Sequence, residues 1–341
     1  MGKIKILNPG FFTTIQDKGR FGYRSLGIAS SGAMDRFSYE IANFLVGNKM
    51  LMPSLEMMIS GPEIQFYNKE LISICGGNLN PRINNKEVPL WTAIKVNSGD
   101  VLSFKGDKNG MVAYLSFAGG LHVNKVLNSY STNIKGHFGG VCGRNLKLND
   151  DIEILTNETN INQYINNKLP NQYVPIYKNS INVNVILGPQ DDYFSKEEIN
   201  KFLDETYEIS PLIDRVGFRL SGESLVHKKG SNIISDANNI GSIQVPGDGM
   251  PIILMNDCGT TGGYPKIASV IFSDLDKVAQ LKPGDKIKFT NISLEKSHNL
   301  YKKYYEKLNQ IKGILLDRNL SDNYYNVKVN GNTYVISIEE Q

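Results

Sequence analysis

One stretch of the chain gathers side chains that can carry out acid–base and electrostatic chemistry. After the apolar, strand-like run Pro251 to Met255 come an acid, two hydroxyls, paired glycines, an aromatic ring and a lysine: Asp257, Thr260, Thr261, Gly262, Gly263, Tyr264 and Lys266. The glycines can adopt positive φ and leave backbone N–H groups uncovered, which suits close approach of an anion or a carbonyl oxygen. The same composition is typical of a turn between two strands, with Pro265 setting its exit.

Two further acids stand beside arginines in loops that contain glycine. Asp17 lies three residues before Arg20, and Asp214 directly precedes Arg215. An arginine can form two parallel hydrogen bonds with a carboxylate or a phosphate. Arg20 can equally pair with Asp17 and pin its own loop. Asp35 precedes an apolar run of helical spacing, where an N-cap acceptor is expected, so capping is its simplest role.

Other catalytic motifs are missing from the sequence, which contains no phosphate-binding P-loop, Rossmann fingerprint, zinc-protease helix or nucleophile elbow. Cys258 is a conceivable nucleophile, but no histidine is near it in sequence and the neighbouring acid disfavours a thiolate. His122 and His137 have no second histidine at a ligand offset, so no metal site is predicted.

Acid–base and electrostatic chemistry therefore remains. Its groups are four acids and three cations: Asp17, Asp35, Asp214, Asp257, Arg20, Arg215 and Lys266. This set fits a polarised amide or acyl-phosphate substrate, in which charge builds on oxygen and requires fixed donors. Ion-paired loops that support two barrels need the same residues, and composition and spacing do not choose between the two.

Composition narrows the class of protein. With 341 residues, 40% hydrophobic and 21% charged, the sequence is that of an ordinary soluble globular protein, more consistent with two domains than with one. A net charge of +3 without a basic run argues against nucleic acid as a partner. Three widely spaced cysteines predict a reducing cytoplasm, and the lack of an apolar run of about 18 residues argues against a membrane span.

Short strands separated by turns dominate the pattern, as between Leu55 and Phe104, and this spacing favours a barrel or sandwich over βαβ units. Helices are predicted at residues 36–46, 195–207, 273–281 and 293–316, and a hairpin at 327–336. Short motifs of the first half recur in the same order in the second, including the Asp17 and Asp214 loops. We therefore expect two related β-barrel domains at 1–155 and 181–290, an Asn-rich linker at 156–180, and a terminal helix and hairpin at 291–341.

Several of these motifs together resemble a known family, the KipA-like proteins, which are the C component of 5-oxoprolinase. This family is related to the carboxyltransferase portion of urea carboxylase and to proteins labelled allophanate hydrolase subunit 2. The resemblance covers most of the chain, from about Ile4 to Phe289. The matching stretches are 13–17 with Gly19-Arg20 and Gly22-Tyr23, 31–35, Ala42-Asn43, 45–48, 118–120, 188–190, Asp214-Arg215, 243–246 and 260–267.

The resemblance implies β-barrel domains of cyclophilin-like type and a role in the ATP-dependent opening of 5-oxoproline to glutamate. It implies a complex with two other oxoprolinase proteins, a KipI-like B component and a LamB/YcsF-like A component. Carried onto this chain, it adds Tyr23, Met34 and Gln244 to a substrate- or phosphate-binding set that holds Arg20, Asp35, Arg215 and residues 260–264, beside the catalytic candidates Asp257, Lys266, Asp17 and Asp214. This sequence departs from the family at Gly259, where glutamine is common, and at Ile213, where a polar residue is common.

Two other functions remain open. One is carboxyl transfer from carboxybiotin to urea or a related amide; since the sequence has no Met-Lys-Met biotin attachment site, we expect no covalently attached biotin, and a carrier would come from another chain. The other is a non-enzymatic role as a partner that antagonises a KipI-like kinase inhibitor. In either enzymatic case we expect the chain to be inactive alone.

Overall fold

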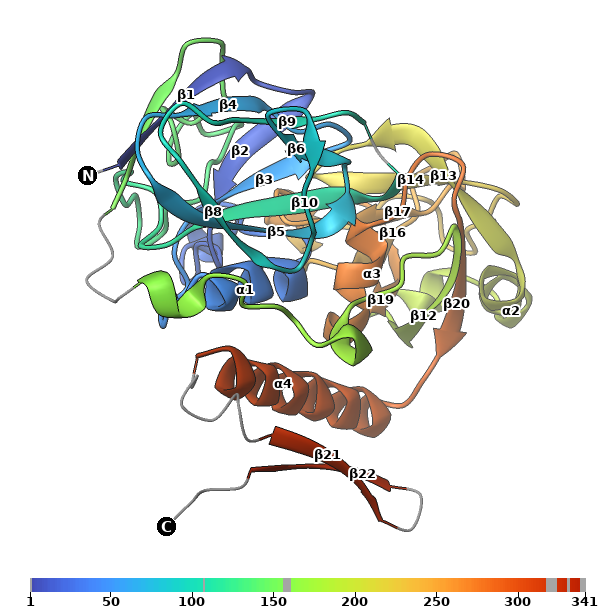
Figure 1. Ribbon diagram of the computed structural model, residues 1–341. Helices are drawn as coiled ribbons and strands as arrows, with labels where there is room; N and C mark the ends of the chain where they lie inside the picture. Colours follow the sequence, from blue (N-terminus) through green and yellow to red (C-terminus); the bar gives the residue numbers. More distant parts are fainter. Residues whose placement is uncertain (1, 107, 156–160, 317–323, 330–331, 338–341) are drawn as a thin grey trace.

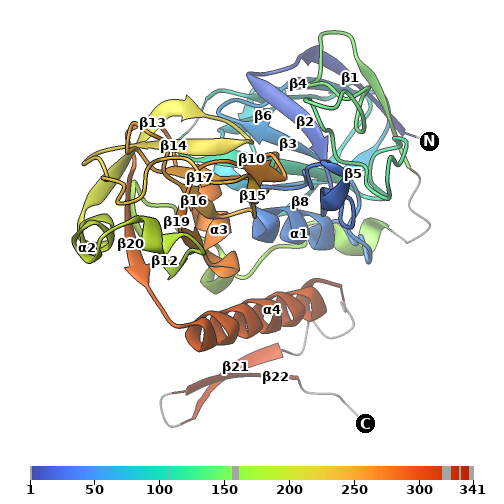
Figure 2. The same cartoon turned by 180° about the vertical axis from the view of Figure 1, so that it is seen from behind.

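The computed structural model describes residues 2–106, 108–155, 161–316, 324–329 and 332–337. Two strand-rich halves lie side by side, and a long helix runs beneath both of them (Figures 1 and 2). The prediction of a mainly β protein is confirmed. Within the described residues, no helix is long and apolar enough to cross a membrane.

The first half consists of two antiparallel sheets, ordered β11-β1-β4-β9-β6-β7 and β2-β3-β10-β5-β8. Its strands are β1 (Gly2–Asn8), β2 (Phe12–Gln16), β3 (Ser54–Met58), β4 (Glu63–Phe66), β5 (Glu70–Asn78), β6 (Pro81–Ile83), β7 (Lys86–Glu87), β8 (Ala93–Val96), β9 (Val101–Phe104), β10 (Asn109–Phe117) and β11 (Asp151–Ile154). Apolar and charged side chains alternate along β1, so one face of the strand enters the core. Ile4 and Ile6 are fully buried, whereas their neighbours Lys3 and Lys5 are partly exposed. The buried faces of the two sheets share one hydrophobic cluster.

The second half is a closed seven-stranded barrel, ordered β12-β19-β16-β17-β14-β13-β20, in which only the β12–β20 pair is parallel. Its strands are β12 (Ser180–Leu187), β13 (Thr206–Ile213), β14 (Gly217–Ser221), β16 (Ser242–Gln244), β17 (Ile252–Leu254), β19 (Lys266–Val270) and β20 (Lys286–Asn291). Outside the barrel, β15 (Asp236–Ala237) pairs with β18 (Thr261–Gly262), so two segments of the candidate site share a small sheet.

Residues 206–207, predicted as the end of the second helix, belong to β13, but all four predicted helices are present. They are α1 (Arg36–Leu45), α2 (Lys196–Asp204), α3 (Leu275–Ala279) and α4 (Leu294–Leu316), with short 3-10 turns η1 (Arg24–Leu26), η2 (Ile161–Tyr164), η3 (Asn171–Tyr173), η4 (Asp191–Tyr193) and η5 (Phe272–Asp274). Asp35 caps α1 by accepting the Ser38 N–H, as the sequence predicted, and Ser195 caps α2 by accepting the Glu198 N–H.

The segment between the halves is packed against its surroundings. Tyr164 and Leu169 are buried, and the Asn167 amide donates to the carbonyls of Leu45 in α1 and Leu315 in α4, at 3.2 and 3.0 Å. This segment therefore fixes α4 to the first half. Beyond α4, β21 (Tyr324–Val329) and β22 (Asn332–Ser337) form the predicted hairpin, whose Asn-Gly turn lies outside the described residues.

Candidate functional site

Arg215 is the centre of the contact between the two halves. Its side chain is 3% exposed; its Nε donates to Asp257 at 2.8 Å, its Nη1 donates to Glu56 of the first half, and its Nη2 donates to the Gly32 carbonyl at 2.8 Å. Burial alone lowers the pKa of a guanidinium, but the Asp257 and Glu56 carboxylates outweigh it and raise the pKa of Arg215. The side chain is therefore a permanent cation that fixes the position of Asp257.

The loop at residues 31–34 is held from both sides at this contact. The Asn256 amide donates to the carbonyls of Ser31, Gly32 and Ala33, and the Ser31 N–H donates to the Asn256 carbonyl. Gly32 has φ of +89°, and a Cβ there would lie 2.7 Å from the Gly19 Cα, so only glycine fits. The Met34 side chain is buried, and its backbone N–H donates to Glu56, which gives Met34 a structural position.

Asp17 and Arg20 hold a loop of the first half. The Asp17 carboxylate accepts hydrogen bonds from Gly19, Ser129, Tyr130 and Ser131, so both of its oxygens are occupied. Arg20 is fully buried; it donates to the carbonyls of Val126 and Ser131, and its guanidinium lies 4.7 Å from the Phe138 ring centroid.

These contacts correct the expected roles of both residues. They pin the loop at 126–138 to the loop at 17–20, and Arg20 does so through backbone carbonyls without an ion pair to Asp17. Burial lowers the pKa of Arg20, while the nearby carboxylates of Asp17 and Asp257 oppose that change. Arg20 therefore contributes positive potential near Asp257.

Lys266 forms a second cluster, in the barrel half. Its side chain is 3% exposed, and its Nζ lies 3.2 Å from a carboxylate oxygen of Asp236, whose side chain is 49% exposed. Gln190 joins the two, since its amide nitrogen donates to Asp236 and its amide oxygen accepts the Lys266 N–H. The N–H of Ala237, the Gln190 amide and Lys266 lower the pKa of Asp236. Lys266 is therefore a buried ammonium whose only carboxylate partner, among the described residues, faces solvent.

Asn238 bonds to Gln244, which pairs with Lys266 in the barrel, and to Gly259 and Thr260. Its side chain accepts from the Gln244 amide and donates to the Gly259 carbonyl, and its N–H donates to the Thr260 carbonyl. Its own carbonyl accepts from Arg24 of the first half. These contacts hold Gly259 and Thr260, which follow Asp257 in the sequence, but no hydrogen bond among the described residues joins Asn238 to Asp236 or to Asp257.

The two glycines do not adopt the positive φ that the sequence suggested. Gly262 lies in β18, paired with Asp236, and continues an extended strand. A Cβ at Gly262 would lie 2.5 Å from the Gln244 amide nitrogen, whereas the nearest atom to a Cβ at Gly263 is 3.6 Å away. Close packing against two side-chain amides, and not turn geometry, therefore favours glycine at position 262.

The remaining predicted residues are dispersed. Asp214 caps its own turn by accepting the N–H groups of Val216 and Gly217 and is exposed, and Tyr23 accepts from Asn128. Tyr264 is 41% exposed. Burial raises the pKa of the Cys258 thiol, which opposes a nucleophilic role. In the part of the chain that the structure describes, no group of three His, Cys, Asp or Glu side chains is arranged to hold a metal ion.

Sequence reasoning missed the partners of these groups: Glu56, Asp236, Asn238 and Asn256. Glu56 carried the one usable signal, because it is a charged residue inside the apolar run Leu55 to Met58, and a buried carboxylate needs a cation. The structure joins Asp257 and Arg215 directly and brings Arg20 close enough to Asp257 for an electrostatic interaction. Among the described residues, no hydrogen bond or ion pair joins Lys266 to Asp257. A partly exposed carboxylate fixed by arginine can orient water, and a buried ammonium can stabilise charge developing on oxygen.

Comparisons with known proteins give one consistent result. The family model for the carboxyltransferase domain, subdomain A and B, matches residues 26–291. The chain is 33% identical over 318 residues to the C component of 5-oxoprolinase from Haemophilus influenzae, a match that covers 93% of this chain and 100% of that protein. It is 34% identical over 332 residues to urea amidolyase of Saccharomyces cerevisiae, covering 92% of this chain and 18% of that one.

The structural comparison agrees with these sequence matches. The crystal structure of the Kluyveromyces lactis urea carboxylase superposes with a TM-score of 0.85 at 30% identity, over 91% of this chain and 29% of that chain.

Proposed function

We propose that this chain, which belongs to the carboxyltransferase domain family with subdomains A and B, is the C component of an ATP-dependent 5-oxoprolinase. In this proposal it opens 5-oxo-L-proline to L-glutamate in the cytoplasm, together with a KipI-like B component and a LamB/YcsF-like A component. The observation that supports it is the match to the C component of 5-oxoprolinase from Haemophilus influenzae along that protein's whole length.

In the proposed reaction, the lactam carbonyl oxygen is activated by phosphorylation in the assembled complex and water opens the ring. Asp257 positions or deprotonates that water, because it retains 14% exposure while Arg215 fixes its orientation. Lys266 stabilises the charge that develops on the substrate oxygen or phosphate. Its present partner, Asp236, is half exposed, so a bound anion can compete for the ammonium from the solvent side of the pair.

A second candidate is the carboxyltransferase component of a biotin-dependent urea or amide carboxylase. The superposition on the Kluyveromyces lactis urea carboxylase favours it. The same two residues serve this reaction, with Lys266 facing the carboxyl group and Asp257 the accepting amide nitrogen. The two candidates differ in their partners and co-substrates.

The test is reconstitution of the chain with both other oxoprolinase components. We expect ATP-dependent formation of glutamate from 5-oxoproline by the complex and none by the chain alone, since the sequence carries no P-loop. Robust turnover by the single chain would contradict the proposal that activity requires the assembled complex. If the complex is inactive but the chain carboxylates urea with a biotin carboxylase and a carrier, the second candidate holds; binding of the KipI-like component without either activity would favour the antagonist role.

A further inference from the structure

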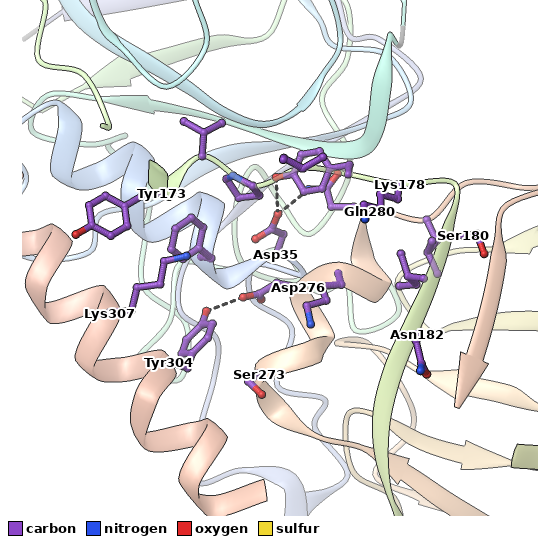
Figure 3. Close-up of a pocket in the computed structure, with 18 of the residues that line it drawn as sticks. Asp35, Tyr173, Lys178, Ser180, Asn182, Ser273, Asp276, Gln280, Tyr304 and Lys307 are labelled. Atoms are coloured by element: carbon purple, nitrogen blue, oxygen red, sulfur yellow. Dashed lines mark hydrogen bonds between the residues drawn. The ribbon is translucent and has the colours of Figure 1, made fainter. Parts of the chain in front are cut away.

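A cavity of about 520 Å³ lies beneath the contact between the halves, walled by the start of α1, the segment at 172–182, α3 and α4 (Figure 3). The carboxyl groups of Asp35 and Asp276 line it, and Asp276 accepts from the Tyr304 hydroxyl at 2.6 Å. Burial raises the pKa of Asp35, and burial with the nearby Asp35 raises the pKa of Asp276 to about 8. Both acids therefore favour the protonated, neutral form, so this cavity offers a ligand no negative charge. Charge without a partner lies instead on a surface of the first half.

Two loops of the first half carry basic residues and no acidic ones. Residues 18–34 and 119–149 contain no Asp or Glu, although the whole chain has 34 of them beside 37 Lys or Arg. The basic residues of the two stretches are Lys18, Arg20, Arg24, Lys125, Lys135, Arg144 and Lys147. Segregation of one sign of charge in this way gives a surface a positive potential that acts on other molecules.

The two loops lie against each other and form one surface. Arg20 is fully buried and donates to the carbonyls of Val126 and Ser131, at 3.0 and 2.9 Å. The Tyr23 hydroxyl accepts a hydrogen bond from the Asn128 amide at 3.1 Å. Because these contacts hold both loops in place before any partner arrives, binding to them requires little further loss of conformational freedom.

Three lysines of this surface have no carboxylate partner. Lys18, Lys125 and Lys135 are exposed, and none of them forms an ion pair with any described residue. The acid before the first of them, Asp17, is buried and accepts four hydrogen bonds, and Asp150 is already in an ion pair. The positive charge of the three lysines is therefore uncompensated within the described chain.

Large apolar side chains are exposed on the same two loops. Phe21, Leu26 and Leu127 are 59%, 71% and 36% exposed, and with the three lysines they form what we call the basic face. A nucleic acid is held mainly through its phosphates, whereas protein interfaces combine charged groups with aromatic and aliphatic side chains. The combination on the basic face therefore matches a protein partner.

We propose that the basic face is a docking surface for another protein, whose contact region is acidic and contains apolar side chains. The identity of that protein rests on the function proposed above: it is one of the other two components of the oxoprolinase complex. The face adjoins the candidate site, because Arg24 donates to the Asn238 carbonyl at 2.5 Å and Arg20 interacts electrostatically with Asp257. Docking there brings the partner to the edge of the site, which fits a chain that is expected to be inactive alone.

The test measures binding of the chain to each purified component by biolayer interferometry, at about 50 mM and about 300 mM salt. We expect the parent chain to bind one component, and more tightly at the lower salt concentration, because salt screens the attraction between exposed charges. A chain that combines Lys18→Glu, Lys125→Glu and Lys135→Glu should bind at least about tenfold more weakly at low salt and lose this salt dependence. Phe21→Ser should weaken binding at both salt concentrations and keep the salt dependence.

The matched control makes the same change in net charge on the same half, outside the two loops. It combines Lys69→Glu, Lys95→Glu and Lys105→Glu, at three exposed lysines, and should bind like the parent chain. Circular dichroism establishes that each variant is folded before its binding is measured.

Three outcomes overturn the inference. They are parent-like binding by the variant of the basic face, failure of both components to bind the parent chain, and binding of polyuridylate or phosphatidylserine vesicles as tight as that of the component. Glutamate formation is assayed separately and reports on the proposed function. A complex that assembles through the basic face and forms no glutamate contradicts that function but not the docking surface. Turnover by a complex that assembles equally well with the variant supports the function and excludes the docking surface.

Discussion

Arg215 of the barrel half and Glu56 of the first half form an ion pair in which the side chains are 3% and 1% exposed. Breaking such a pair leaves a buried charge without compensation, and Arg215→Met strands two carboxylates at once. We expect this change to lower the free energy of unfolding by about 3–5 kcal/mol, measured by urea denaturation.

Arg219→Met is the matched control for that change. Arg219 pairs with Asp248 at 3.3 Å, but both side chains are about half exposed, so we expect a loss below about 1 kcal/mol. Equal losses for the two arginines would show that the contact between the halves does not depend on the buried pair.

Asp257 and Lys266 should matter for turnover beyond any effect that their replacement has on folding. In the reconstituted complex we expect Asp257→Asn and Lys266→Ala each to lower the rate of glutamate formation by roughly 100-fold or more, the usual cost of losing one positioned group. Stopped assays with equal amounts of folded complex measure this effect. A variant that assembles normally and turns over at the parent rate would exclude its residue from the chemistry.

Asp17→Asn should behave in the opposite way. Its carboxylate accepts four hydrogen bonds that hold the loop at 126–131, so replacing it places an amide N–H against donors. We expect a loss of about 1–3 kcal/mol in stability, with activity per folded molecule close to the parent. A normal melting temperature combined with lost turnover would restore Asp17 to the catalytic set.

The neighbouring glycines offer a paired test. A Cβ at Gly262 lies 2.5 Å from Gln244 and 2.8 Å from Asn238, so Gly262→Ala must displace both amides next to Lys266. We expect a cost of about 1–3 kcal/mol and reduced turnover. Gly263→Ala meets only ordinary contacts and should stay within about 0.5 kcal/mol of the parent. Equal melting temperatures for the two variants would mean that the Gln244 side chain moves aside without loss of stability.

Local signals predicted much of this fold. The acceptors Asp35 and Ser195 mark two helix starts because a cap is decided by residues within one turn. Alternation in β1 likewise follows from one buried face. The Asp-Arg loops after β2 and β13 were recognisable as a pair, and both bring an arginine near Asp257.

Contacts between distant segments were not predictable in this way. Glu56 meets Arg215 across 159 positions of sequence, and no local pattern specifies that partner. The preference for glycine at 262 comes from the approach of the Gln244 side chain, so turn chemistry gave the wrong reason for it. The cavity between α1, α3 and α4 exists only once both halves are assembled.

Asp276 should make the stability of the chain depend on pH. The folded chain retains its proton up to about pH 8, whereas an unfolded aspartate loses it near pH 4. Between these values the folded state binds more protons than the unfolded state, so stability falls as pH rises and levels off above about pH 8. Asp276→Asn cannot ionise and escapes this loss. The melting temperature of the variant minus that of the parent should therefore increase by several degrees between pH 5 and pH 8.5. Differential scanning calorimetry of both proteins across this range measures the difference. The charged and titratable groups that contact Asp276 or line the same cavity are present in both proteins: Asp35, Tyr177, Tyr304, Arg36, Lys277 and Lys307. Glu306→Gln, at an exposed acid on α4, serves as the control that should track the parent at every pH. A constant difference between Asp276→Asn and the parent across this range would mean that Asp276 is ionised in the folded chain, and that its charge is already compensated.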